Sequence, residues 1–176
     1  MKRKQAAIFC ASSNQIDPLF NQEARALVRG LHALGYEIIS GGGAVGTMGA
    51  ITDESIRCGG VHIAVLPRFM AGLENPGVTE VIWTDTMAQR KERMRRDADL
   101  VIALPGGIGT LDELIETHTL NKLDQYKGRL FALNLNGFYN PLIALLDHYA
   151  ATGMTLKADI DRICFVDSVE ELLSKL

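Results

Sequence analysis

The sequence predicts an α/β protein with a doubly wound, mostly parallel sheet of about seven strands flanked by helices. Short apolar runs alternate with longer segments of helical period along the chain. Most of these runs are continuously apolar, which is typical of strands covered on both faces of a sheet. Glycine-rich turns follow two of the runs, within 41–49 and 106–109. Strand–helix alternation of this kind indicates right-handed crossovers between parallel strands, a Rossmann-like arrangement.

Seven runs of four to six mainly apolar residues are expected to be strands, because each is too short for a typical helix. They cover 6–10, 36–39, 61–66, 80–83, 100–104, 130–135 and 163–166. The segments between them are expected to be helices at about 18–34, 46–58, 86–98, 110–123, 139–151 and 168–175. Asp17-Pro18 supports the first helix, since proline is common at the first helical position. In such sheets ligands bind beyond the carboxyl ends of the strands, so the site is expected in the loops that follow them.

The composition is that of one globular domain over residues 1–176, with 47% hydrophobic and 22% charged residues. A formal net charge of −3 gives no field that would attract nucleic acid. No apolar stretch approaches the roughly 20 residues of a membrane span. The three cysteines form no C-x-x-C pair, which favours a reducing compartment. We therefore expect a soluble, cytoplasmic protein that binds neither nucleic acid nor a membrane.

The first glycine loop has the pattern G-x-G-x-x-G at Gly41, Gly43 and Gly46. Between a strand and a helix, this pattern lets the backbone approach a phosphate and points the helix N-terminus at the anion. Tight packing of the turn is the alternative explanation for the glycines. The strand at 61–66 is followed by Pro67-Arg68 and lacks the acidic residue that holds the ribose of NAD. NAD is therefore disfavoured, while Arg68 leaves NADP open.

The second glycine loop, Pro105-Gly-Gly-Ile-Gly-Thr-Leu-Asp-Glu113, opens a helix with three glycines and a threonine. Its backbone N–H groups form another nest for an anion. Thr110 and Glu113 also have the spacing of a capping box, which would make Glu113 only a helix-start residue. No Gly-Lys-[Ser/Thr] follows, so a Walker A loop and ATP hydrolysis are not expected. Two such loops on one sheet indicate a phosphorylated ligand that contains a sugar.

The basic helix at 86–98 has an apolar stripe that includes Met87 and Met94, and Arg90 and Lys91 lie between them on the same face. A charge on an inward face is costly without a partner. The guanidinium is therefore expected to bind a phosphate or carboxylate in the site, or to form a structural ion pair with Glu113. The remaining arginines of this helix are expected on solvated surface: Arg93, Arg95 and Arg96.

Three motifs together make the chain resemble the LONELY GUY (LOG) family of cytokinin riboside 5′-monophosphate phosphoribohydrolases. The stretch 105–113 matches the family's P-G-G-x-G-T-x-x-E signature, 87–94 matches M-x-x-R-K-x-x-M, and the glycine stretch at 41–50 also fits. The resemblance implies cleavage of the N-glycosidic bond of a nucleoside 5′-monophosphate, with Arg90 and Glu113 as the catalytic pair. It also implies substrate contacts at Glu74, Lys91, Gly107, Ile108, Gly109, Thr110, Leu111, Asp112 and Thr119. The two glycine loops and the end of the first strand supply four further expected contacts with the substrate: Gly106, Gly42, Gly43 and Ser13.

Hydrolysis of a glycosidic bond passes through an oxocarbenium-like transition state, so a carboxylate near the sugar is needed. We expect Glu113 to stabilise this charge or to activate water, and Arg90 to keep Glu113 ionised. The expected partners are AMP or an N6-substituted AMP and, from the resemblance, a second copy of the chain. No cofactor is expected, and no metal, because the four histidines lack metal-ligand spacing. The rivals are a non-catalytic carrier of a nucleotide or a pterin-type cofactor, and an NADP-dependent reductase.

Overall fold

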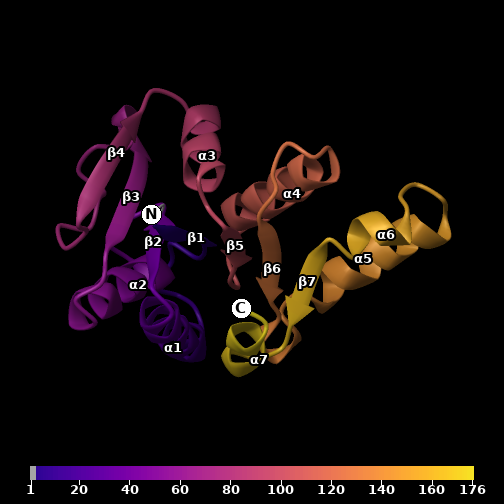
Figure 1. The fold of residues 1–176 in the computed structure, drawn as a ribbon, viewed down its shortest axis with the longest axis horizontal. Helices are drawn as coiled ribbons and strands as arrows, with labels where there is room; N and C mark the ends of the chain where they lie inside the picture. Colours follow the sequence, from indigo (N-terminus) through magenta and orange to yellow (C-terminus); the bar gives the residue numbers. More distant parts are fainter. Residues whose placement is uncertain (1–2) are drawn as a thin grey trace.

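The computed structural model describes residues 3–176, whose seven strands form one sheet in the order β4-β3-β2-β1-β5-β6-β7 (Figure 1). The strands are β1 (Lys4–Phe9), β2 (Tyr36–Ser40), β3 (His62–Pro67), β4 (Glu80–Thr84), β5 (Leu100–Ala103), β6 (Arg129–Leu133) and β7 (Ile163–Val166). All neighbouring strands in this sheet are parallel. The predicted α/β fold is therefore confirmed, with a sheet that is wholly parallel rather than mostly so.

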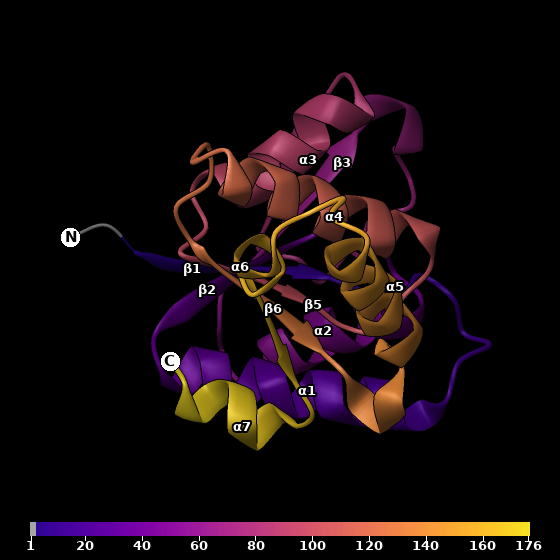
Figure 2. The same ribbon diagram turned by 90° about the vertical axis from the view of Figure 1, so that its right-hand side faces the viewer.

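Helices cover both faces of the sheet, as Figures 1 and 2 show. One face carries α1 (Pro18–Ala33), α2 (Gly46–Arg57) and α7 (Val169–Ser174). The other carries α3 (Met87–Arg96), α4 (Ile108–Lys122), α5 (Asn140–Ala151) and the short α6 (Lys157–Ile160). The core accordingly has two parts, one centred on Leu27 and Ile102 and the other on Met94 and Leu114. Burial on both faces explains why the strands read as continuous apolar runs.

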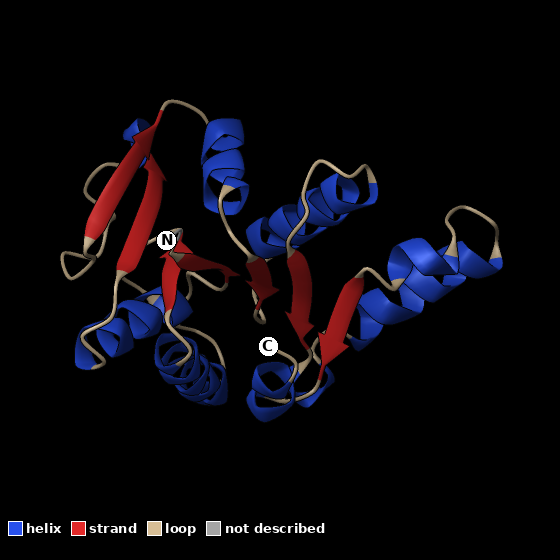
Figure 3. Cartoon of the chain, in the orientation of Figure 1, coloured by secondary structure: helices blue, strands red, loops and turns tan. Residues whose placement is uncertain are grey.

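The structure departs from the predicted boundaries at a few places (Figure 3). β6 ends at Leu133, whereas the apolar run continues to Leu135, which is buried in the short 3₁₀ helix Leu135–Gly137. Asn136 has a φ of 52° there, and the chain turns within Asn134-Leu-Asn-Gly137, where only Leu135 continues the apolar pattern. The sequence does not predict two other short helices, α6 and Arg68–Met70, because each is too short to show a helical period.

The topology directs several loops to one edge of the sheet. The chain builds the sheet outward from β1 to β4 and then returns to place β5 against the other side of β1. The order reverses between β1 and β5, and a crevice forms at the carboxyl ends of strands at such a switch point. Among residues 3–176, none of the helices combines the length and apolar character required to cross a membrane.

Candidate active site

A cavity of about 570 Å³ opens at the carboxyl ends of β1, β2 and β5, the edge at which the sequence predicted a site. Its walls come from the two glycine loops, the segment 70–73, Arg90 of α3 and Glu113 of α4. A larger groove of about 740 Å³ lies between α3 and α4, next to the amino ends of β5 and β6. Neither glycine loop lines that groove, and parallel sheets bind ligands at the opposite edge. The smaller cavity is therefore the candidate active site.

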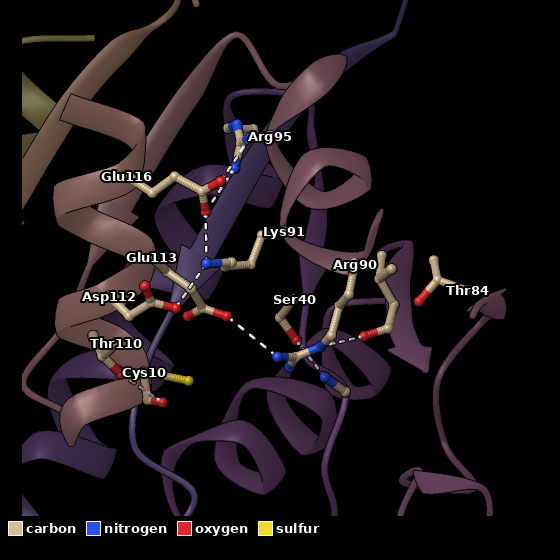
Figure 4. Close-up of polar contacts among 12 residues, drawn as sticks. Cys10, Ser40, Thr84, Arg90, Lys91, Arg95, Thr110, Asp112, Glu113 and Glu116 are labelled. Carbon is tan, nitrogen blue, oxygen red and sulfur yellow. Dashed lines mark hydrogen bonds and ion pairs between the residues drawn. The ribbon is translucent and has the colours of Figure 1, made fainter. Parts of the chain in front are cut away.

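Arg90 and Glu113 form a buried ion pair in this cavity (Figure 4). The two side chains come from different helices and are each only 8% exposed. The Nη1 of Arg90 lies 3.3 Å from Oε1 of Glu113, and its Nε donates to the carbonyl of Val65, at 2.9 Å. The bond to β3 holds the guanidinium in place, so that it presents one edge to the carboxylate. The fold thus brings together the two residues that the sequence singled out, which are 23 positions apart in the chain.

Burial controls the ionisation of Glu113. The low-dielectric surroundings raise the pKa of this carboxyl from 4.5 to about 7, although the Arg90 guanidinium acts in the opposite direction. This pKa is the net result, to which the neighbouring carboxylates of Asp112 and Glu116 also contribute by raising it and the ammonium of Lys91 by lowering it. Arg90 thus acts on the pKa of Glu113 in the expected direction, but desolvation outweighs the attraction of this one cation, so the carboxyl is not held fully ionised at neutral pH. A carboxyl of this kind is about half ionised at neutral pH, where it both takes up and releases protons.

Cys10 also lines the cavity, after the end of β1. Burial raises the pKa of its thiol, and the nearby Glu113 carboxylate raises it further. The thiol is therefore protonated at neutral pH and is a poor nucleophile.

The second glycine loop leads directly into α4, which begins at Ile108 with Gly107 as its N-cap. Its Gly107, Ile108, Gly109 and Thr110 line the cavity. The hydroxyl of Thr110 donates to the carbonyl of Cys10, at 3.1 Å, and so ties α4 to the end of β1. The capping-box alternative is wrong, because the helix starts two residues before Thr110. The free N–H groups of this first turn are those that bind anions in other proteins.

The first glycine loop has a mixed role. Gly41 and Gly43 line the cavity, and a Cβ at Gly41 would overlap the Nη2 of Arg90. Gly42 has a φ of 65° and is turned toward β3, where a Cβ would overlap Ala64. Gly46, with a φ of 61°, packs against the backbone of the 11–13 segment. Tight packing thus accounts for two of these glycines, while the other two form the cavity wall.

The structure divides the predicted contacts into two groups. Seven of them line the cavity: Gly43, Arg90, Gly107, Ile108, Gly109, Thr110 and Glu113. The others lie beyond its lining: Ser13, Gly42, Glu74, Lys91, Gly106, Leu111, Asp112 and Thr119. Of these, Glu74 pairs with the backbone of Gly43 next to the cavity. The roles of this second group in substrate binding stay predictions.

Lys91 is held between α3 and α4. Its ammonium lies 2.9 Å from Asp112 and 2.9 Å from Glu116. Arg95 is buried as well and pairs with Glu116, at 3.2 Å, so the prediction of a solvated Arg95 is wrong. Lys91 and Arg95 are one helical turn apart and face α4, an arrangement that only the packing of the two helices reveals. The resulting ion-pair network holds the two helices that carry Arg90 and Glu113 (Figure 4).

The cavity also has an apolar part that the sequence patterns did not single out. Met48, Leu66, Met70 and Leu73 line it together with the hydroxyl-bearing Ser12. The available signal was position alone, since Met70 and Leu73 follow a predicted strand. Among residues 3–176, no three histidine, cysteine or acidic side chains are grouped so that they could hold a metal ion.

Comparison with known proteins adds independent findings. The family model described as "Possible lysine decarboxylase" matches residues 48–176. A probable cytokinin riboside 5′-monophosphate phosphoribohydrolase of Oryza sativa subsp. japonica is 37% identical over 172 residues, which cover 96% of this chain and 77% of the rice protein. A cytokinin riboside 5′-monophosphate phosphoribohydrolase of Mycobacterium marinum is 31% identical over 173 residues, with coverage of 97% and 92%. The molybdenum cofactor carrier protein of Chlamydomonas reinhardtii is similar in fold, with a TM-score of 0.75 over 98% of this chain and 95% of that chain, at 16% identity.

Proposed function

The chain belongs to the LONELY GUY (LOG) family, and from this premise we propose that it hydrolyses the N-glycosidic bond of a nucleoside 5′-monophosphate. The base is a purine or a cytokinin, and the products are the free base and ribose 5-phosphate. The observation that carries the proposal is the buried Arg90–Glu113 pair beside the glycine-lined N-terminus of α4. Carboxyls with strongly raised pKa values cluster at catalytic sites, and the pKa of about 7 for Glu113 therefore favours hydrolysis over a purely binding role.

In the proposed reaction, Glu113 acts on the sugar. As a carboxylate it stabilises the positive charge that develops on the ribose, or it takes a proton from the attacking water. A pKa of about 7 suits the second role, because a general base works best when its pKa is near the operating pH. Arg90 touches Glu113 and orients it, while its bond to Val65 keeps the guanidinium in position.

The glycine loops hold the phosphate. The backbone at Gly107, Ile108 and Gly109 lines the cavity at the positive end of the α4 dipole. Binding energy from the phosphate then fixes the ribose in a reactive position next to Glu113. Met48, Leu66 and Met70 provide apolar contact for the base.

Decarboxylation of lysine, which the family description suggests, is not supported by the site. Pyridoxal phosphate chemistry requires a lysine that forms a Schiff base with the cofactor. Within residues 3–176, no lysine lines the cavity, and the ammonium of Lys91 is held by two carboxylates. The residues present therefore do not fit that cofactor.

We propose that the protein is a homodimer or a higher homo-oligomer. Large apolar side chains are exposed close together on α4, on α5 and just before α5, namely Ile108, Leu111, Phe138 and Leu145. Ile108 also lines the cavity, so an interface here would lie next to the site. The other parts of the proposal are one domain over residues 1–176, supported by the single sheet, and a cytoplasmic location, supported by three free cysteines. Light scattering of the purified chain measures the oligomeric state.

The test of the activity is base release from AMP and from an N6-substituted AMP, measured by chromatography. The Glu113→Gln variant keeps the shape of the side chain, and we expect it to lose about 10²–10⁴-fold in kcat. Glu92→Gln, an exposed position on α3 outside the cavity lining, is the control for the same chemical change and is expected to retain activity within a few-fold. Binding of AMP by the wild-type chain without release of adenine would contradict the proposal and favour the carrier. Bound nicotinamide would favour the reductase.

A further inference from the structure

A buried serine–histidine pair adjoins the site and has no part in the proposed chemistry. Ser40 is the last residue of β2 and His62 the first residue of β3, and they are 0% and 1% exposed. The register pairs His62 with Ile38 and Ser40 with Ala64, so both side chains point to the same face of the sheet. The Oγ of Ser40 lies 2.8 Å from the Nε2 of His62.

The second bond of Ser40 reaches into the first glycine loop. Its Oγ accepts the backbone N–H of Gly42, at 3.0 Å, which is the local serine turn that closes over two residues. A hydroxyl has one proton, and His62 is the available acceptor for it among the described residues. If the proton of the neutral His62 ring is on Nδ1, Nε2 accepts the serine proton and only the Nδ1–H group is left without a partner. The other tautomer leaves two, namely Nδ1 and the serine O–H. Because the first tautomer leaves fewer buried polar groups without a partner, we assign Nε2 of His62 as the acceptor of the serine proton.

The turn held in this way packs against Arg90. Gly42 adopts its φ of 65° with no room for a Cβ beside Ala64, and its carbonyl accepts the N–H of Asn75, at 2.8 Å. The preceding residue, Gly41, lies against the Arg90 guanidinium, where a Cβ would overlap Nη2. Gly41 therefore supports the side of Arg90 that does not bind Glu113.

We propose that Ser40 and His62 are positioning residues for the hydrolysis. His62 accepts from Ser40, Ser40 holds the N–H of Gly42, and the turn that results keeps Gly41 against Arg90 and thereby aligns Arg90 with Glu113. The inference rests on the proposed function, because its effect on rate depends on that pair. It predicts an effect on kcat rather than on KM, since the second glycine loop binds the phosphate independently of this turn.

The chain contains a matched control for this pair. His32 of α1 and Ser55 form a similar pair between two helices, with Nε2 of His32 3.1 Å from the Oγ of Ser55. Ser55 is 1% exposed and belongs to α2, and neither side chain lines the cavity. Loss of this hydroxyl removes a bond of the same chemistry without touching the glycine turn.

The kinetic test compares Ser40→Ala with Ser55→Ala in the assay of base release from AMP. We expect Ser40→Ala to lower kcat about 10- to 100-fold with KM within about threefold, because misplacement by about 1 Å has effects of this size. Ser55→Ala is expected to keep both constants within about twofold. At the second position, His62→Leu should lower kcat as Ser40→Ala does, and His62→Gln, which retains an acceptor oxygen, should recover most of it. Equal kcat values for Ser40→Ala and Ser55→Ala would overturn the proposal.

A second measurement does not depend on activity. In the full-length chain, ¹⁵N shifts should show a His62 imidazole protonated at Nδ1 and free at Nε2, and the Gly42 amide should be protected from hydrogen exchange. Ser40→Ala should remove that protection and Ser55→Ala should not. If wild-type protein releases no base, the proposed function fails, and the Gly42 exchange still decides whether the pair holds the turn. Unchanged Gly42 exchange in Ser40→Ala would refute the inference even in an active enzyme.

Discussion

Replacement of Arg90 by methionine tests how the buried ion pair sets the ionisation of Glu113. The two charged groups lie 3.3 Å apart with both side chains 8% exposed, so solvent screens their interaction little. An opposite charge at this distance lowers a carboxyl pKa by about 1–3 units. Without it, the pKa of Glu113 should rise from about 7 to between about 8 and 10. The ionised fraction at pH 7 then falls from about one half to between about a tenth and a thousandth.

The assay is the rate of base release from AMP as a function of pH for wild type and Arg90→Met. Activity of the wild type should rise with pH through about 7, because the carboxylate is the active form. For Arg90→Met we expect a loss of about 5- to 500-fold at pH 7, part of which is recovered as the pH approaches 9. Arg93→Met, on the same helix and paired with Asp97, is the control and should follow the wild-type profile. An unchanged inflection in Arg90→Met would refute the reasoning.

Two further predictions concern the same pair. Because folding raises the pKa of Glu113 from 4.5 to about 7, its protonated form favours the folded state. This contribution of about 3 kcal/mol is complete below pH 4.5 and is lost as the pH rises through about 7. In urea titrations, the free energy of unfolding of Glu113→Gln, relative to that of wild type, should therefore increase by about 3 kcal/mol from pH 4.5 to pH 8. The same pH dependence of the unfolding free energy in both proteins would contradict this. Gly41→Ala places a methyl group on the Arg90 guanidinium and should lower kcat about 10- to 100-fold in steady-state assays. A wild-type kcat would show that the guanidinium moves aside without consequence.

The chain order of strands and helices was predictable because it depends on local patterns. A strand buried on both faces must be apolar throughout, and a turn from strand to helix beside an anion requires glycine. The run that ends β6 shows the limit of such patterns, since Leu135 stays apolar although the strand has already ended. Asn134, Asn136 and Gly137 around it are typical turn residues, so the turn signal outweighs the apolar character of Leu135.

Sequence alone predicted the α/β fold, the two glycine loops and an inward-facing Arg90 that could pair with Glu113, because spacing along a strand or helix fixes which side chains share a face. Tertiary structure decided the rest. It set the pKa of Glu113 by burial, placed Arg95 on Glu116 and tied Thr110 to Cys10 across 100 residues. It also determined that Gly41 and Gly43 face the cavity while Gly42 and Gly46 serve packing. Desolvation and close contact depend on residues that are distant in the chain, so no local pattern contains them.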